Sequence, residues 1–120
     1  MPNKRADGGA FEDLAAGFLA AKGYRILGRN VHILRKEVDI VAADGDTIVF
    51  IEVKGRRSDA FGTAAEAVAA RKQRHLVRVA TAYLEREGLW DRACRFDVVG
   101  VTLGRDGSPV VDHIENAFSA

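Results

Sequence analysis

The chain has 120 residues, of which 48% are hydrophobic and 29% charged, and its formal net charge is +1. These values are typical of one soluble globular domain and exclude an intrinsically disordered chain. Apolar runs, such as residues 48–51, reach only four residues, which is far too short to span a membrane. The single cysteine, Cys94, excludes an internal disulfide and a cysteine-rich zinc site. Because residues 1–9 are polar and carry no secretory signal, we expect a cytoplasmic protein without a membrane partner.

The first half of the chain predicts one helix followed by three strands. Residues 1–9 end in Asp-Gly-Gly and indicate a flexible arm ahead of a single domain over residues 10–120. Apolar residues at helical spacing predict an amphipathic helix over residues 10–22, ended by Gly23. Residues 24–34 predict one bent strand or two short ones. Two β-branched runs, 38–42 and 47–53, flank an Asp-Gly-Asp turn and predict a β-hairpin.

The second half predicts a helix and two more strands. A capping-box pattern from Thr63 to Glu66 indicates a helical start, and a longer helix is predicted over residues 70–87. Residues 96–103 and 110–114 predict strands. A helix between the hairpin and the next strand indicates a crossover, so at least one strand pair should be parallel. The order α-β-β-β-α-β-β therefore predicts an α/β or α+β domain with a mixed sheet and helices packed on it.

Charged residues interrupt the predicted hairpin where a core strand should be apolar. Because side chains alternate along a strand, Glu52 and Lys54 share a face with Ile48 and Phe50. A two-residue or four-residue turn pairs Ala42 with Thr47. Asp39 then lies opposite Phe50, on the face of Glu52 and diagonal to it, whereas a plain three-residue turn puts Asp39 on the other face.

Such a cluster suits a divalent cation. Two carboxylates ~4 Å apart repel by about 4 kcal/mol at an effective dielectric constant near 20, and a cation removes this cost. Oxygen ligands favour Mg²⁺ or Mn²⁺, which can activate a water and bind a phosphate oxygen. Lys54 can orient the water or stabilise charge in the transition state. Asp39, Glu52 and Lys54 therefore predict phosphodiester hydrolysis; the alternative is a surface ion pair.

Basic residues gather in two places on this almost neutral chain. Residues 67–84 contain Arg71, Lys72, Arg74 and Arg78 and no acidic residue. Three further cations, Lys54, Arg56 and Arg57, follow the predicted hairpin. A locally basic face can follow the phosphates of a nucleic acid. The alternative is a solvated helix face and loop.

Five segments together resemble the YraN-like family of small bacterial proteins: residues 11–15 (FEDLA), 36–42 (KEVDIVA), 49–54 (VFIEVK), 72–73 (KQ) and 95–99 (RFDVV). This family is assigned to the PD-(D/E)XK nuclease-like superfamily, near the archaeal Holliday junction resolvases. The resemblance implies an αβββαβ core of restriction-endonuclease type. Lys36 stands where the family usually has glycine, and Phe11-Glu12 replaces the usual Gly-Glu.

The resemblance also implies roles for individual residues. Asp39, Glu52 and Lys54 match the signature triad, Glu12 matches an acidic residue that often completes the metal site, and Gln73 matches a polar residue of the second core helix. The alternatives are an exposed first-turn acid for Glu12 and a core hydrogen bond for Gln73. Asp97, in an apolar strand, is interpreted as a hydrogen-bonded structural residue.

We therefore expect a Mg²⁺-dependent or Mn²⁺-dependent nuclease-like protein that acts on DNA, with branched or structured DNA as one substrate class. Asp39, Glu52 and Glu12 would hold the metal, and Arg56, Arg57, Lys72 and Arg74 would bind phosphates. The oligomeric state, including a homodimer, is open. Two alternatives remain: a catalytically silent nucleic-acid-binding module of the same fold, and a structural adaptor whose hairpin docks a partner protein.

Overall fold

The computed structural model describes the backbone of residues 4–57 and 70–118 and the side chains of residues 9–55 and 70–118. The predicted order of elements is confirmed. The elements are α1 (Lys4–Ala21), β1 (Arg25–Ile33), β2 (Lys36–Asp44), β3 (Thr47–Arg57), α2 (Ala70–Arg86), β4 (Cys94–Leu103) and β5 (Pro109–Phe118). The capping-box segment 63–66 lies outside the described residues.

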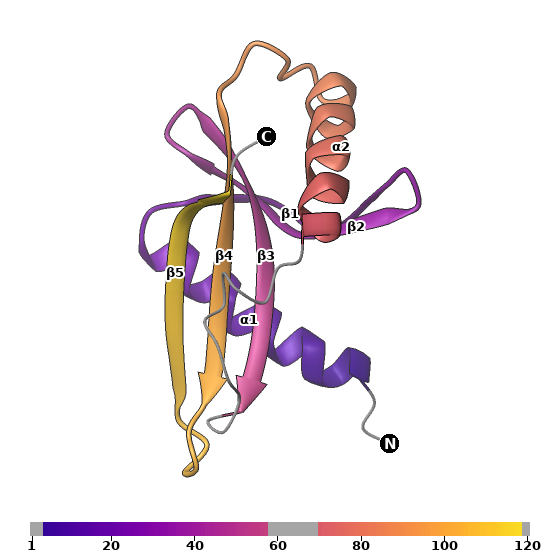
Figure 1. The fold of residues 1–120 in the computed structure, drawn as a ribbon. Coiled ribbons are helices and arrows are strands. Elements are labelled where there is room, and N and C mark those ends of the chain that lie inside the picture. Colours follow the sequence, from indigo (N-terminus) through magenta and orange to yellow (C-terminus); the bar gives the residue numbers. More distant parts are fainter. Residues whose placement is uncertain (1–3, 58–69, 119–120) are drawn as a thin grey trace.

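The five strands form one mixed sheet in the order β1-β2-β3-β4-β5. Strands β3 and β4 are parallel, as the crossover through α2 requires, and the other neighbours are antiparallel. Helices α1 and α2 cover opposite faces of this sheet (Figure 1). The fold class predicted from the sequence, a mixed α/β domain consistent with an αβββαβ core, is therefore confirmed.

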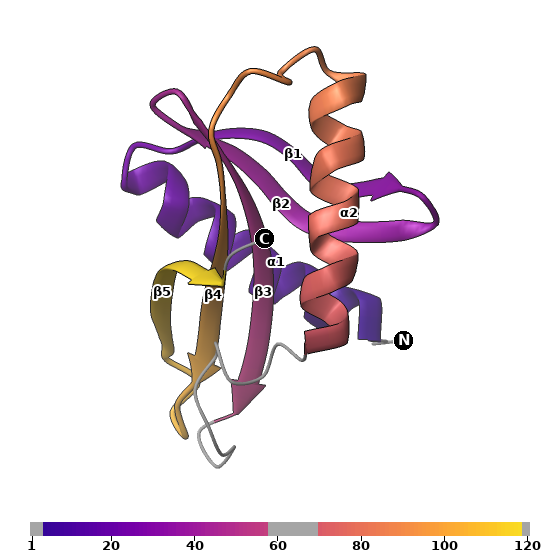
Figure 2. The ribbon, with the colours of Figure 1, turned by 45° about the horizontal axis from the view of Figure 1, so that its top comes forward.

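Each face of the sheet has its own apolar core. Ala15 and Leu19 of α1 pack with Ile40, Val49 and Ile51 on one face. On the other face, α2 packs five buried residues against the sheet: Leu76, Val79, Ala80, Tyr83 and Leu84. Figure 2 shows α2 lying across β1 and β2, with α1 behind the sheet. Ile48 and Phe50 of β3 pack in this same core, on the α2 face of the sheet.

Both helices end as their glycines predict. Gly23 has φ +99°, and the amides of Gly23 and Tyr24 bond the carbonyls of Ala20 and Leu19. Gly88 repeats this Schellman pattern after α2, with φ +69°. The last residues of both helices are thus set by glycines that adopt a left-handed conformation.

Helix α1 begins earlier than predicted, at Lys4 instead of residue 10. Part of the segment predicted as a flexible arm, residues 4–9, is therefore helical. Two glycines there cost about 1 kcal/mol each relative to alanine, which made a turn the expected conformation. Packing of Ala15 and Leu19 nucleates the helix, however, and extending an existing helix costs much less free energy than starting one. The two glycines therefore do not stop it.

The β2–β3 hairpin has an even loop, but its register differs from the prediction. Asp44 pairs with Thr47, so the loop is Gly45-Asp46 and Ala42 pairs with Val49. The prediction that Ala42 pairs with Thr47 is wrong by two residues. An even shift alone would keep Asp39 on the face of Glu52 and place it level with Glu52 instead of Phe50, but the alternation of β2 breaks between Val38 and Ile40, so the register does not fix the face of Asp39.

Candidate metal centre

The sheet forks between β2 and β3. Pairing between these strands ends at Ile40 and Ile51, whereas β2 continues with β1 to Lys36 and β3 continues with β4 to Arg57. Beyond this point the edge of β3 that faced β2 has no strand partner among the described residues. A fork exposes backbone amides to side chains and to ligands, and Asp39 and Glu52 lie in it.

Asp39 lies at the start of the fork. Its Oδ2 accepts a hydrogen bond of 2.8 Å from the backbone amide of Val53. The alternation of β2 also breaks here, because Val38 packs in the α2-side core and Ile40 in the α1-side core. The carboxylate thus takes the place of a strand partner and is held beside the backbone that carries Glu52.

Glu52 occupies the α2 side of the fork and is only 6% exposed. Its Oε1 lies 3.5 Å from Lys54 Nζ, and its Oε2 lies 3.9 Å from Lys72 Nζ. Because 3.9 Å is too long for a hydrogen bond, Oε2 accepts none within the described part of the chain. A buried carboxylate oxygen without a hydrogen bond is costly unless a cation compensates for it.

Asp39 is electrostatically linked to Glu52. Burial and, after it, the negative charge of Glu52 raise the pKa of Asp39 to about 7. The hydrogen bond from Val53 and the charge of Lys72 act in the opposite direction. The fork therefore brings Asp39 and Glu52 together with two lysines, Lys54 and Lys72, and the roles predicted for these residues stay predictions.

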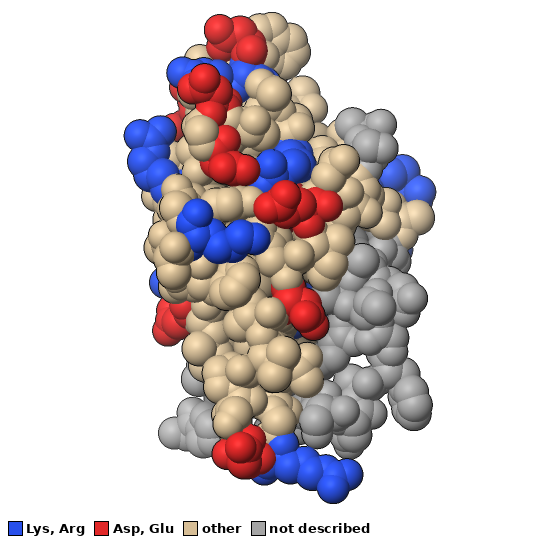
Figure 3. Space-filling model, turned by 90° about the vertical axis from the view of Figure 1, so that its left-hand side faces the viewer, with Lys and Arg blue, Asp and Glu red and all other residues tan. Residues whose placement is uncertain are grey.

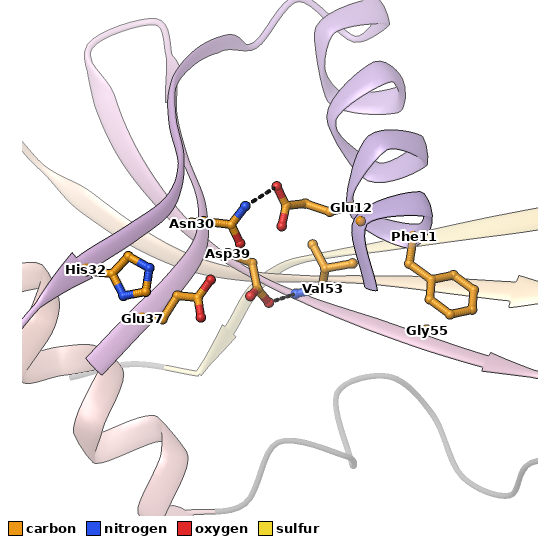
Figure 4. Close-up of a pocket in the computed structure, with 9 residues that line it drawn as sticks. Phe11, Glu12, Asn30, His32, Glu37, Asp39, Val53 and Gly55 are labelled. Atoms are coloured by element: carbon orange, nitrogen blue, oxygen red, sulfur yellow. Dashed lines mark hydrogen bonds between the residues drawn. The ribbon is translucent and has the colours of Figure 1, made fainter. Parts of the chain in front are cut away.

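A cavity of about 520 Å³ opens on the α1 side of the fork. Figure 4 shows the side chains around it, with Asp39 among them. The lining residues come from α1 and the first three strands: Gly9, Phe11, Glu12, Asn30, His32, Glu37, Asp39, Val53 and Gly55. Three of them are acidic and none is Lys or Arg, so the cavity favours cations. Lys36 does not line it.

Glu12 is buried in the middle of α1, so the alternative of an exposed first-turn acid is wrong. Its Oε1 accepts hydrogen bonds from Arg29 Nε at 2.7 Å and Asn30 Nδ2 at 3.1 Å. Arg29 also bonds Asp13. Asn30 has φ +51°, which few residues other than glycine adopt readily. These contacts fix one oxygen of Glu12 in the wall of the cavity shared with Asp39.

The oxygen ligands suit a hydrated divalent cation. Among the described residues, no three His, Cys, Asp or Glu side chains are arranged to hold a metal ion. Mg²⁺ does not need three, because it usually keeps several waters and uses one or two carboxylates together with substrate phosphates. Asp39 and the unsatisfied Oε2 of Glu52 fit that requirement. Glu12 lines the adjoining cavity, and its role as a ligand stays a prediction.

The predicted phosphate-binding residues are only partly placed. Lys72 and Arg74 lie on α2, where Lys72 contacts Glu52 and Arg74 is exposed. Arg56 and Arg57 are in β3, but their side chains lie outside those described. Gln73 is half-buried on α2. On the face that carries β5, acidic and basic side chains are interspersed (Figure 3), so that face offers no patch of one sign.

Sequence reasoning missed Arg29, Asn30, His32 and Glu37. His32 pairs with Glu37 across β1 and β2, and both line the cavity. The two-residue turn at Leu34 and Arg35, where both residues have positive φ, sets that pairing. Neither residue is Gly, Asn or Asp, so the usual sequence signal for such a turn is absent.

A second polar cluster lies on the α1 face, toward the start of β4 and away from the fork. Asp97 is buried and accepts hydrogen bonds from Arg95, His113 and the amide of Asn116. Lys22 Nζ lies 2.8 Å from His113 Nδ1, so Nε2 carries the proton that bonds Asp97. The interpretation of Asp97 as a hydrogen-bonded structural residue is confirmed.

Comparison with known proteins identifies the family. The profile of a family described as "Uncharacterised protein family UPF0102" matches residues 11–101. The chain belongs to the UPF0102 family. A UPF0102 protein of Symbiobacterium thermophilum is 51% identical over 116 residues, which cover 97% of this chain and 98% of that protein. UPF0102 proteins of Geobacter sulfurreducens and Moorella thermoacetica are 47% and 49% identical, covering 89% and 96% of this chain and 84% and 97% of theirs.

The match confirms the YraN-like resemblance at the level of the family. The UPF0102 description assigns no activity. None of the helices in the described part of the chain is long and apolar enough to cross a membrane.

Proposed function

We propose that this UPF0102 protein is a metal-dependent nuclease that hydrolyses phosphodiester bonds in DNA, with branched or structured DNA among its substrates. The observation that supports this most is Glu52, whose buried Oε2 accepts no hydrogen bond from the described residues and whose two oxygens each face a lysine, with Asp39 close by. An acid pair of this kind is expensive to keep in a fold that uses it only for stability.

Each residue of the site would have its own role in hydrolysis. Asp39 and Glu52 would hold Mg²⁺ or Mn²⁺, with Glu12 in the adjoining wall. The bound ion would supply an activated water and neutralise charge on the phosphate. Lys54, held 3.5 Å from Glu52, would place its ammonium beside the reacting phosphate and stabilise developing charge. Arg74, exposed on α2, and Arg56 and Arg57 would hold flanking phosphates.

One observation favours the second candidate, a catalytically silent nucleic-acid-binding module. No group of three metal-ligating side chains is formed among the described residues. Such a module would keep the basic residues and the fold while cleaving nothing. Cleavage that depends on both the metal and Glu52 separates the two functions.

A cleavage panel tests the proposal. Single-stranded, duplex, flap and four-way-junction DNA are incubated with the protein in Mg²⁺, Mn²⁺ or EDTA, beside Glu52→Gln, which keeps the shape of the side chain. We expect products only with metal and only with the wild-type protein. DNA that is bound but never cut would favour the silent module, and no binding at low salt would favour the adaptor.

A further inference from the structure

Lys72 supplies the positive charge that faces the unsatisfied oxygen of Glu52. Its Nζ lies 3.9 Å from Oε2, close enough for an ion pair and too far for a hydrogen bond. The Lys72 side chain is 41% exposed, whereas that of Glu52 is 7% exposed. The carboxylate is therefore fixed in the fold, and the lysine has solvent into which it can move.

The charge of Lys72 reaches the second carboxylate as well. Asp39 is held beside the backbone of Glu52 by its hydrogen bond from the Val53 amide, and Lys72 interacts electrostatically with Asp39 as well as with Glu52. One ammonium group thus faces two acids that come from different strands. A buried acid pair needs such a counter-charge whenever it holds no metal.

Lys54 is placed differently. It is on the same strand as Glu52, two residues away, and faces Oε1. A cation that takes Oε2 therefore leaves Lys54 beside the carboxylate, whereas it competes directly with Lys72. The acidic cavity reaches Asp39 from the α1 side, and the half-exposed Lys72 stands between Oε2 and solvent on the α2 side, so a cation reaches Oε2 only as Lys72 moves away.

We infer that the Lys72 ammonium is an exchangeable counter-ion: it neutralises the Asp39–Glu52 pair in the metal-free protein and is displaced when a divalent cation binds. This inference rests on the proposed function. Displacement frees a half-exposed lysine on α2 to bind a DNA phosphate. Metal binding and DNA binding then strengthen each other, because both depend on the position of Lys72.

Metal binding tests the exchange directly. Mn²⁺ is titrated into the metal-free wild type, Lys72→Met and the control Arg71→Met by calorimetry. Arg71 is an exposed cation on the same helix and forms no ion pair with Asp39 or Glu52. Because Lys72 no longer competes, we expect Lys72→Met to bind Mn²⁺ about tenfold more tightly. Arg71→Met should match the wild type.

DNA binding tests the coupling. The affinity for a four-way junction is measured in Ca²⁺ and in EDTA at equal ionic strength. Ca²⁺ should strengthen binding by the wild type several-fold and strengthen binding by Lys72→Met little or not at all. If Lys72→Met does not fold, Lys72→Gln takes its place in both measurements.

The outcomes separate this inference from the proposed function. Mn²⁺ affinity in Lys72→Met equal to or below that of the wild type overturns the exchange, even if the wild type cleaves DNA. An equal Ca²⁺ effect in both proteins overturns the coupling. Absence of Mn²⁺ binding in every protein overturns both the inference and the proposed metal site.

Discussion

Asp39 accepts a hydrogen bond from the backbone amide of Val53 at the point where β2 and β3 separate. This bond holds a carboxylate where the sheet would otherwise continue. It also satisfies an amide at the newly exposed edge of β3. The cost is a negative charge beside Glu52 in partly buried surroundings.

Asp39→Asn should stabilise the metal-free protein. Asparagine keeps an oxygen for the Val53 amide and removes one charge from the acid pair. We expect a rise in the free energy of unfolding of about 1–3 kcal/mol at pH 8 in EDTA, measured by urea denaturation. Mg²⁺ should stabilise the wild type and have much less effect on the variant. A loss of stability on substitution would indicate an ordinary ion pair at Asp39.

The pH dependence of this gain has a definite sign. The pKa of Asp39 is about 7 in the folded protein, above the value near 4 of an unfolded aspartate. Between these values the folded state binds more protons, so the stability contributed by Asp39 falls as pH rises from about 4 to 7. The advantage of Asp39→Asn should therefore be largest above pH 7 and vanish near pH 4. A gain that is constant across this range would contradict the raised pKa.

Gly55→Ala should disturb the wall of the cavity. A Cβ on Gly55 would lie 2.2 Å from Phe11 Cδ2 and 2.4 Å from Cγ, so the ring or α1 must shift. We expect a loss of about 1–3 kcal/mol in stability and weaker Mn²⁺ binding, because Phe11 precedes Glu12. Calorimetry and urea denaturation measure the two effects.

The matched control for Gly55 is Gly17→Ala. Gly17 lies within α1, and a Cβ there meets nothing within 4 Å. This substitution should raise stability by about 0.5–1 kcal/mol, because alanine favours the helix. An equal change in the free energy of unfolding in Gly55→Ala and Gly17→Ala would show that the close approach of Phe11 to Gly55 does not affect stability.

The fold was predictable where local signals decide it. The α2 pattern, the glycine C-caps and the apolar hairpin each follow from nearby residues. The register was not, because a period of two does not distinguish a shift by two residues, and the break in alternation between Val38 and Ile40 left the face of Asp39 unpredicted as well. Likewise, the contact of Glu12 with Arg29 and Asn30 depends on how α1 packs against β1, which no local pattern contains.

Asn30→Asp should destabilise the cavity wall. It replaces the amide that donates to Glu12 at 3.1 Å with a second carboxylate. Removing a hydrogen bond and adding a like charge should cost about 1–3 kcal/mol at pH 7. Asn30→Gly removes the same bond but favours φ +51°, so its loss should be smaller. Thermal melts of both variants make the comparison, and a larger loss in Asn30→Gly would refute it.

Asp97→Asn should destabilise the protein strongly while leaving Mn²⁺ binding intact. Burial alone would raise the pKa of Asp97, but hydrogen bonds from His113, Arg95 and the Asn116 amide outweigh it and lower the pKa. An asparagine amide would face these donors and leave Arg95 without its carboxylate, at a cost of about 3–5 kcal/mol.

The pH dependence of this cost follows from the pKa of Asp97. Because the folded pKa is depressed, the stability that the Asp97 carboxylate contributes is present above about pH 4 and is lost as pH falls through the folded value. Urea denaturation from pH 7 to pH 3 should therefore show the two proteins converging in acid. A difference in the free energy of unfolding that stays constant across that range would show that Asp97 stabilises the protein through its packing and not through its charge.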